Sequence, residues 1–266
     1  MNEDIIKMEE KLTYFYNIGA IQAKKLLSRL LELKLVDSTK VKNDEYTLKD
    51  LRKILLKKEI FEELPEATKT DLKMQPLRVI PRPIISLIDK ELQRIFSSEL
   101  FKKKIKFDLA GSYIRGKSTS GDIDMVLSQI TWDNFKEKIN QNSQIIQFCE
   151  PFAKGSDKIA TLIKVDLSKS DLNKLEINKN YQVYVKIDIF LSNLEDYVFA
   201  MLFATGSGTF NIRMRATAKR QGYLLNHHGL YLKKAGGILE KVLLKNEKDI
   251  FDILGMSYLE PKNRLK

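Results

Sequence analysis

An acidic pair at the start of an apolar, strand-like segment constrains this chain more than any other feature of its sequence. Asp122 and Asp124 flank Ile123, ten residues beyond Ser112, and the segment that follows reads MVLS. Residues i and i+2 of a β-strand project from the same face, so the two carboxylates should lie side by side. Because neighbouring carboxylates repel each other, a divalent cation between them is the natural arrangement.

A third carboxylate fits the same cluster. Asp188 lies between Ile187 and Ile189 in YQVYVKIDIFL, a segment whose composition predicts a strand with a buried face. If this strand pairs beside Asp124, the three Asp side chains can hold two Mg²⁺ ions, which Mn²⁺ could replace. Two such ions roughly 4 Å apart would activate a 3′-hydroxyl and carry the phosphates of a nucleotide.

Residue types that bind phosphate surround the acidic pair: glycines with accessible backbone N–H groups, two serine hydroxyls and one guanidinium. They are Gly111, Gly116, Gly121, Ser112, Ser120 and Arg115. An isolated Asp-x-Asp pair is a weak signal, because alternating Asp residues are common on exposed strand edges. Combined with these neighbours and with Asp188, the pattern predicts metal-dependent phosphoryl transfer.

The first 80 residues have the apolar spacing of helices and a single glycine, Gly19. We expect helical structure over 9–35, interrupted at 17–20. One amphipathic helix should cover 47–64, with Thr47 as its N-cap. This part of the chain is therefore predicted to be a helical module.

Residues 81–192 have a different residue pattern, in which strand-like segments appear between predicted helices, and this pattern predicts a central α/β part. Pro83 in a first-turn position predicts a helix to about Ser97, and a second helix should follow Thr131. Five further segments have the polarity pattern and the β-branched and aromatic residues of strands in a mixed sheet. They are IKFDLA, MVLS, QIIQF, KIATLIKVDL and YQVYVKIDIFL.

Residues 193–266 return to helices, followed by a hairpin near Gly229–Gly237 and a last helix that ends at Gly255. This part should be a mixed α/β module. The chain as a whole is thus predicted to be an α+β protein in three parts, over 1–80, 81–192 and 193–266.

The charge and the composition of the chain limit the kinds of partner it can bind and the cellular compartment in which it can work. The chain carries 46 Lys and Arg against 35 Asp and Glu, a net charge of +11 that favours a polyanion. A single cysteine and two adjacent histidines, His227 and His228, argue against a disulfide framework and against a structural zinc site. With neither a bilayer-length apolar run nor a signal peptide visible, we expect no membrane partner and an intracellular protein of the nucleus or cytoplasm.

Four segments resemble, in order and spacing, the family X DNA polymerases, of which DNA polymerase beta is the best-known member. They are GSYIRGKSTSGDIDMVL, VKIDIF, FATGSGTFNIRMRA and EKDIFDILGMSYLEPKNR. Upstream, LTYFYNIGAIQAKK is similar to the second helix-hairpin-helix of the family and VIPRPI to its Ile-Pro-Arg segment. The resemblance implies a helix-hairpin-helix DNA-binding subdomain over 1–80, a nucleotidyltransferase-type palm over 81–192 and a nucleotide-selection subdomain over 193–266.

The resemblance also implies residue roles. Asp122, Asp124 and Asp188 would bind the metal ions, and Asp188 would accept the proton of the primer 3′-hydroxyl. Contacts to the incoming nucleotide would come from Arg82, Ser112, Arg115, Ser120, Gly121, Phe203, Thr205, Gly206 and Asn211. Contacts to DNA would come from Asn17, Gly19, Gln22, Lys24, Lys25, Lys186, Arg213 and Arg215. Backbone carbonyls of the hairpin often hold a monovalent cation, Na⁺ or K⁺.

This sequence departs from the family pattern at several points. No counterpart of the family's N-terminal 5′-deoxyribose-phosphate lyase domain is seen, so we expect no lyase activity. Asn17 replaces a hairpin glycine, but Asn tolerates a left-handed backbone. Lys186 and Phe190 replace arginines, Gly208 an aspartate and Ala204 an aromatic residue. The last three bear on fidelity and sugar discrimination rather than on the chemistry.

The sequence thus predicts a DNA-directed DNA polymerase that acts as a monomer on primer–template or gapped DNA with dNTPs. Short-gap filling in repair, as in base excision repair or end joining, is the expected setting, and a viral replication site is an alternative location. Template-independent addition, nucleotidyl transfer to RNA ends, antibiotics or proteins, and a non-catalytic DNA-binding scaffold stay open. The hairpin and the Asn211–Arg215 segment argue against small acceptors, and the three carboxylates argue against a scaffold.

Overall fold

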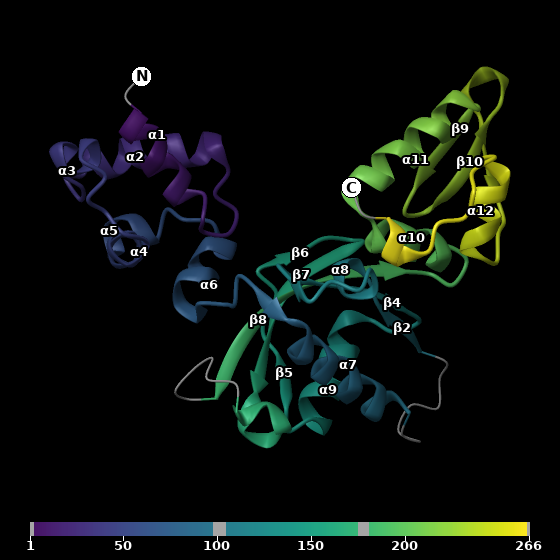
Figure 1. Cartoon of the computed structure of the whole chain (residues 1–266), viewed down its shortest axis with the longest axis horizontal. Helices are drawn as coiled ribbons and strands as arrows, with labels where there is room; N and C mark the ends of the chain where they lie inside the picture. Colours follow the sequence, from purple (N-terminus) through teal and green to yellow (C-terminus); the bar gives the residue numbers. More distant parts are fainter. Residues whose placement is uncertain (1–2, 98–104, 175–180, 265–266) are drawn as a thin grey trace. The chain divides into compact units, whose positions relative to one another are not determined.

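The computed structural model describes residues 3–97, 105–174 and 181–264. They belong to two compact units, Met1–Gln75 and Pro76–Lys266 (Figure 1). Among the described residues, helices occur in both units and every strand lies in the second. The α+β class predicted from the sequence is therefore confirmed. No helix in these ranges combines the length and apolar composition needed to cross a lipid bilayer.

The first unit is built from helices around one hydrophobic core. In chain order they are α1 (Glu3–Leu12), α2 (Ala20–Glu32), α3 (Ser38–Lys42), α4 (Leu48–Leu55), α5 (Lys58–Phe61) and α6 (Glu66–Met74). Met8 and Leu12 of α1, Leu27 of α2 and Leu51 of α4 are buried together in that core. The loop between α1 and α2 covers residues 13–19, so it overlaps the interruption predicted at 17–20 but begins four residues earlier.

The single helix predicted over 47–64 is wrong, because the structure has two helices there, α4 and α5. Thr47 caps α4 as predicted. The helix ends at Leu55, and a break at 56–57 reorients the chain so that Leu55 and Ile60 are both buried. Residues five apart on one continuous helix lie on different faces, so an unbroken helix could not bury both in the same core.

The second unit begins with the elements that carry the acidic residues. They are β1 (Ile80–Pro81), α7 (Arg82–Phe96), β2 (Lys106–Leu109), α8 (Gly111–Ile114), β3 (Thr119–Ser120), β4 (Ile123–Ser128), α9 (Trp132–Asn142), β5 (Ile146–Phe148), β6 (Ala153–Lys154), β7 (Lys158–Asp166), the short 3-10 turns η1 (Leu167–Lys169) and η2 (Asp171–Lys174), and β8 (Gln182–Ser192). Both helices and all five strands predicted for this region are present.

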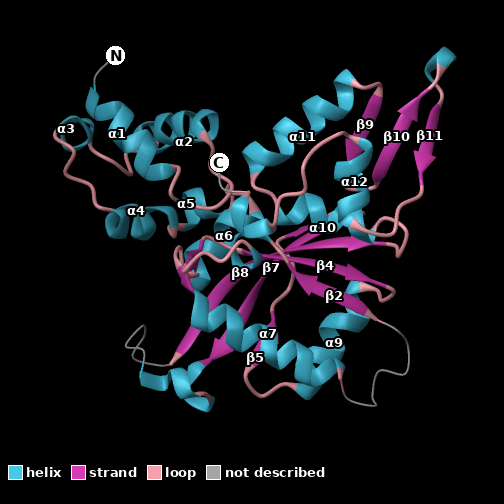
Figure 2. Cartoon of the chain, turned by 45° about the vertical axis from the view of Figure 1, so that its right-hand side comes forward, coloured by secondary structure: helices cyan, strands magenta, loops and turns pink. Residues whose placement is uncertain are grey.

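These strands form a mixed sheet with the order β2-β4-β8-β7-β5, and β6 pairs with β7. The β4–β8 pair is parallel, while the other neighbours are antiparallel. Alternate residues of β4 and β8, such as Met125 and Ile187, pack with α7 and α9 in one core. The residues between them, such as Val126 and Phe190, pack with α10 on the other face. Figure 2 shows these helices on the two sides of the strands.

The rest of the second unit is a smaller α/β part. Its elements are α10 (Tyr197–Thr205), α11 (Gly208–Arg220), β9 (Tyr223–Asn226), β10 (Gly229–Lys233), η3 (Ala235–Gly237), β11 (Leu239–Val242), α12 (Glu247–Ile253) and η4 (Pro261–Asn263). The three strands form an antiparallel sheet in the order β11-β10-β9. The predicted glycine-containing hairpin is the β10–β11 pair, and Gly255 follows α12 with a φ of 58°.

Candidate active site

Asp124 and Asp188 stand directly opposite each other on two parallel strands. Asp124 of β4 is paired in register with Asp188 of β8, and Asp122 lies just before β4. Ile187 and Ile189 are fully buried in the core beneath α7 and α9. Because strand residues alternate between faces, the paired Asp side chains project from the opposite face of the sheet.

Two lysines contact the carboxylates of Asp122 and Asp188. Lys186 Nζ donates to Asp122 Oδ2 at 3.2 Å and to Asp188 Oδ2 at 3.3 Å. Lys158 Nζ, at the start of β7, donates to Asp188 Oδ2 at 2.7 Å. The structure thus brings the three predicted carboxylates into one acidic cluster. Lys158 was missed from the sequence, because only the antiparallel pairing of β7 with β8 places it there.

The acidic cluster has the electrostatics of a cation site. Burial, reinforced by the charges of Asp122 and Asp188, raises the pKa of Asp124 to about 7. The buried Oδ1 of Asp188 accepts no hydrogen bond from any described residue. Carboxylate oxygens are the ligands that Mg²⁺ prefers, and an ion among them would relieve both the repulsion and the unmatched oxygen. The chemistry of these residues fits divalent metal ions, although the three carboxylates do not each place an oxygen within 4.8 Å of the other two.

Gly111 lies against the Asp124 carboxylate. Its φ is 64°, and a Cβ at this position would lie 2.0 Å from Asp124 Oδ2. The preceding N–H, that of Ala110, donates to the Asp124 carbonyl at 2.8 Å. The close approach leaves room only for glycine, so α8 begins directly at the acidic cluster. By contrast, a Cβ on Gly121 would meet nothing within 4 Å.

The loop after α8 gathers the predicted phosphate-binding residues. Ser112 Oγ donates to Ser120 Oγ at 2.6 Å. Pairing of Ile80 with Ser120 brings the start of α7 to the same loop. Arg82 Nη1 donates to the Tyr113 carbonyl at 2.7 Å, and its guanidinium lies 4.3 Å from the Tyr113 ring centre. Arg82 is thus fixed beside the two serines.

A second group of predicted nucleotide contacts meets at the end of α10. Arg115 Nη1 donates to the Thr205 carbonyl, and Asn211 Nδ2 donates to the Phe203 carbonyl at 2.8 Å. Gly206 has a φ of 64°, and its Cβ would lie 3.4 Å from Arg115 Nη1 and 4.0 Å from Asn211 Nδ2. The α10–α11 turn therefore brings these five residues together.

One face of α11 is basic and exposed. Its buried residues recur every four positions, as the sequence predicted: Phe210, Met214 and Ala218. The basic face of α11, defined by its exposed cationic side chains, consists of Arg213, Arg215, Lys219 and Arg220. The Arg215 guanidinium lies 5.0 Å from the Phe203 ring centre, so it reaches back toward the group at the end of α10.

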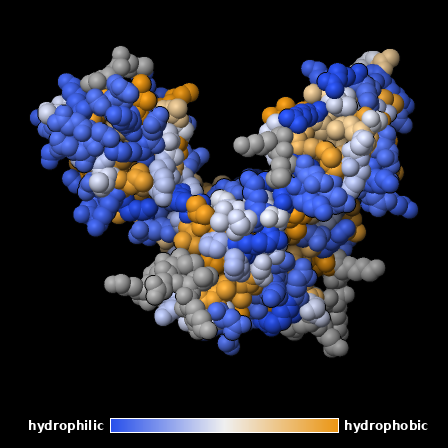
Figure 3. Space-filling model, in the orientation of Figure 1, coloured by the Kyte–Doolittle hydropathy of each residue, from blue (hydrophilic) through white to orange (hydrophobic). Residues whose placement is uncertain are grey.

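Hydrophilic residues dominate the visible surface of both units (Figure 3).

The remaining predicted DNA contacts lie in the first unit, on the α1–α2 loop and on α2. All of them are exposed: Asn17, Gly19, Gln22, Lys24 and Lys25. Asn17 adopts the left-handed conformation with a φ of 62°, as its tolerance for that region suggested.

Helix α6 anchors this loop. The Tyr16 N–H donates to Asp71 Oδ2 at 3.2 Å, and the Tyr16 carbonyl accepts from Thr68 Oγ1 at 2.6 Å. Thr68 and Asp71 are fully buried. The role of Thr68 and Asp71 was not predicted from the sequence. The pattern that could have indicated it is the presence of two polar residues on the apolar side of a short helix.

Comparison with known families accounts for most of the second unit. The model of the DNA polymerase beta palm matches residues 79–191, and that of the DNA polymerase beta thumb matches residues 200–265. The chain belongs to family X of the DNA polymerases.

Individual relatives are consistent with membership of family X. The chain is similar to DNA polymerase lambda of Rattus norvegicus, with 26% identity over 175 residues that cover 63% of this chain and 30% of the relative. DNA polymerase lambda of Arabidopsis thaliana is 26% identical over 204 residues, 70% of this chain and 36% of that protein. DNA nucleotidylexotransferase of Xenopus laevis is 33% identical over 113 residues, 40% of this chain and 22% of that protein. This family X chain thus matches about a third or less of the length of these relatives.

Proposed function

We propose that this family X chain is a template-dependent DNA polymerase that extends a primer 3′ end with dNTPs. In this proposal it acts as a monomer on primer–template or gapped DNA and fills short gaps in repair, as in base excision repair. The observation that carries the proposal is the in-register pairing of Asp124 with Asp188, with Asp122 tied to Asp188 through Lys186.

The acidic cluster supplies the chemistry. Asp122, Asp124 and Asp188 would hold two Mg²⁺ ions, for which Mn²⁺ could substitute. Such ions, when bound, lower the pKa of the attacking 3′-hydroxyl and neutralise phosphate charge. Asp188 accepts the proton of that hydroxyl, a role for which its buried, unmatched Oδ1 is suited.

The loop after α8 and the α10–α11 turn bind the nucleotide in this proposal. Backbone and side-chain donors near Ser112, Ser120 and Gly121, with the guanidinium groups of Arg82 and Arg115, would bind the triphosphate. The sugar and base would rest against the group at the end of α10: Phe203, Thr205, Gly206 and Asn211. The hydrogen bonds that already link the members of each group support this assignment, since they hold the side chains in place before the nucleotide arrives.

DNA would be held through separate elements. Arg213 and Arg215 on the basic face of α11, together with Lys186, would contact DNA near the primer end. In the first unit the α1–α2 loop and the exposed Lys24 and Lys25 would follow the phosphate backbone, with Na⁺ or K⁺ at the loop. The net charge of +11 supports such contacts. The subdomain ranges 1–80, 81–192 and 193–266 belong to the same proposal.

Template-independent addition is the second candidate, because one of the relatives is a DNA nucleotidylexotransferase. The position of Arg215 favours template use, since its guanidinium lies beside Phe203, where the incoming sugar is expected. An intracellular location and the absence of lyase activity stay predictions.

Gap filling separates the two candidates. The full chain is incubated with Mg²⁺, a DNA carrying a single-nucleotide gap, and each of the four dNTPs in turn; a matched substrate has an abasic site opposite the gap. We expect rapid incorporation of the complementary dNTP only, and a large loss on the abasic template. Equal incorporation on both substrates would reject template dependence, and no incorporation on any primer would reject the polymerase activity itself.

A further inference from the structure

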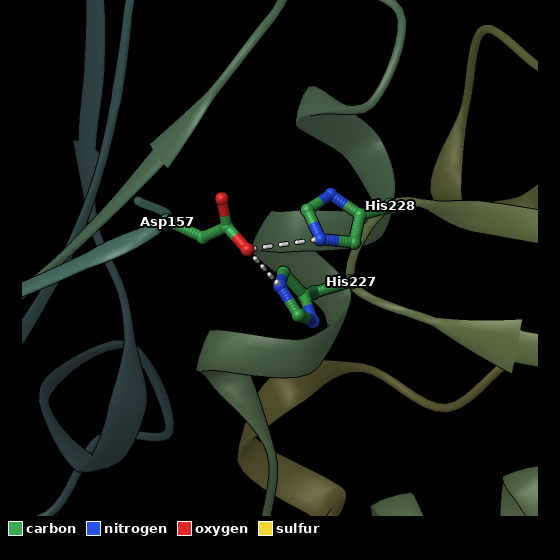
Figure 4. Close-up of side chains that lie close together, drawn as sticks. All are labelled: Asp157, His227 and His228. Carbon is green, nitrogen blue, oxygen red and sulfur yellow. Dashed lines mark ion pairs between the residues drawn. The ribbon is translucent and has the colours of Figure 1, made fainter. Parts of the chain in front are cut away.

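Two adjacent histidines and an aspartate distant in sequence converge outside the acidic cluster (Figure 4). His227 and His228 form the turn between β9 and β10, and Asp157 precedes β7 in the turn after β6. His228 Nε2 lies 3.3 Å from Asp157 Oδ2, and His227 Nε2 lies 3.9 Å from the same oxygen. One ligand atom from each residue lies within 4.8 Å of the other two.

These separations suit a single metal ion. Bonds of about 2.0–2.2 Å to a tetrahedral Zn²⁺ place neighbouring ligand atoms roughly 3.3–3.6 Å apart. The His228 Nε2–Asp157 Oδ2 distance of 3.3 Å falls in that range, the His227 Nε2–Asp157 Oδ2 distance of 3.9 Å is slightly longer, and all three ligand atoms lie within 4.8 Å of one another. Imidazole nitrogens with one carboxylate are the ligand set of first-row transition metals, whereas Mg²⁺ favours oxygen ligands alone.

The surroundings of His228 support ligation through Nε2. Its other ring nitrogen, Nδ1, faces Asp196 Oδ2 at 3.8 Å. Asp196 is buried and is itself held by Lys241 and by Asn193, whose Nδ2 donates to Asp196 Oδ2 at 3.0 Å. A carboxylate that accepts a hydrogen bond from the second nitrogen of a ligating histidine orients the ring. At 3.8 Å Asp196 is too far for that hydrogen bond, so the ring would move toward it on ligation.

We propose that Asp157, His227 and His228 bind one divalent transition-metal ion of the Zn²⁺ class, with the remaining coordination position open to water. The side chains are partly exposed, with relative side-chain accessibilities of 45%, 29% and 41%, so the ion can enter from solvent. The sequence argued against a structural zinc site because the chain has only two histidines. The third ligand, Asp157, lies on a turn that is distant in sequence and that the fold brings close to His227 and His228.

Such an ion would connect the β6–β7 turn of the main sheet to the β9–β10 turn. The His227 ring lies 5.5 Å from the Phe203 ring, against which the Arg215 guanidinium also lies. The bound metal would therefore hold the β9–β10 turn next to the end of α10. Because metal binding is measured without DNA or dNTP, its failure is distinguishable from failure of the proposed polymerase activity.

Zn²⁺ competition tests the site. The full chain competes with a chromophoric chelator for Zn²⁺ in excess Mg²⁺, and Co²⁺ added in place of Zn²⁺ reports four-coordinate nitrogen and oxygen ligation by its visible absorption. We expect one Zn²⁺ per chain, with H227A, H228A and D157N each weakening binding by more than about tenfold, the scale seen even for outer-shell changes.

Two variants serve as controls. D133N removes another exposed carboxylate, and D188A removes a member of the acidic cluster; both should keep the same Zn²⁺ stoichiometry and Co²⁺ spectrum. Asp157, His227 and His228 lie on turns, whereas Asp133 is in α9 and Asp188 in β8, so circular dichroism is recorded for every variant to show that it is folded. Wild-type binding no tighter than that of D157N, or binding that D188A abolishes, would overturn the proposal and leave the three residues as an ion-pair cluster only.

Discussion

Asp124 and Asp188 are paired in register on adjacent parallel strands, so their carboxylates project from the same face of the sheet. The buried isoleucines on either side of Asp188 set this arrangement. A slip of one residue would expose Ile187 and Ile189 and bury Asp188 in the core, at a cost of several kcal/mol by ordinary transfer energies, about 1.5–3 kcal/mol for each large apolar side chain. Packing of the sheet therefore also specifies the geometry of the acidic cluster.

Gly111→Ala should abolish most activity, because a Cβ there would collide with Asp124 Oδ2 at 2.0 Å. Displacing a reacting group by about 1 Å can cost roughly 100-fold in rate, and we expect at least that loss in single-turnover primer extension. Gly116→Ala is the matched control, since Gly116 also has a positive φ, 81°, but no atom lies within 4 Å of its Cβ. Equal losses in the two variants would show that backbone strain, not contact with Asp124, is responsible.

Arg215→Ala should reduce templated incorporation more than it reduces DNA affinity. Arg213 and Arg215 are both exposed on α11, but only the Arg215 guanidinium is found beside the Phe203 ring, so Arg213 serves as the control. Incorporation on a gapped template and equilibrium DNA binding are measured for both variants. A parallel fall of rate and affinity in Arg215→Ala, matching that of Arg213→Ala, would make Arg215 an ordinary backbone contact.

The strands and the face of each acidic residue were predictable because they depend on local alternation. A carboxylate between Ile187 and Ile189 must face away from a core that buries both, whatever the partner strand is. Pairing of the Asp188 strand beside Asp124 was a hypothesis that would gather the three carboxylates, with no strand direction predicted, and the structure pairs Asp188 with Asp124 in parallel.

Features that depend on distant segments were not predictable in this way. The helix breaks at 56–57 because Leu55 and Ile60 are both buried in one core. Helix propensity depends on local sequence and does not include this tertiary requirement. Lys158 reaches Asp188 only through the pairing of β7 with β8. The contact of Gly111 with Asp124 likewise arises because the backbone at Gly111 lies close to the Asp124 side chain in the fold. The local sequence around neither residue indicates this contact.

Asn17 tests the α1–α2 loop. Its φ of 62° is accessible to glycine without strain, whereas alanine pays about 1–2 kcal/mol in the left-handed region. We expect Asn17→Gly to keep DNA affinity and Asn17→Ala to lower both the stability of the first unit and DNA affinity. Fluorescence anisotropy with duplex DNA and thermal unfolding measure the two quantities. Unchanged DNA affinity in Asn17→Ala would remove the loop from the DNA-binding surface.

Glu91 gives the second unit a pH-dependent stability. Its buried carboxylate accepts from Arg94 Nε at 2.8 Å and from Ser143 Oγ at 2.6 Å, and the hydrogen bond from Arg94 holds the pKa of Glu91 below its usual range. A lowered folded-state pKa means that the stabilisation is complete above the unfolded value and is lost as the pH falls through the folded one.

Glu91→Gln should therefore destabilise the chain at neutral pH, and the difference from wild type should shrink below about pH 4.5. Urea unfolding at a series of pH values measures it, with the exposed Glu137→Gln as a control that should change stability little. A difference between wild type and Glu91→Gln that stays constant across this pH range would contradict the account.

The most direct test of the acidic cluster is primer extension by Asp188→Ala on single-nucleotide gapped DNA in Mg²⁺, with DNA affinity measured on the same preparation. If the three carboxylates perform the chemistry, extension is abolished while DNA affinity stays within a few-fold of wild type. Substantial residual extension by a folded Asp188→Ala chain would contradict the assignment of Asp188, and with it the account of the site.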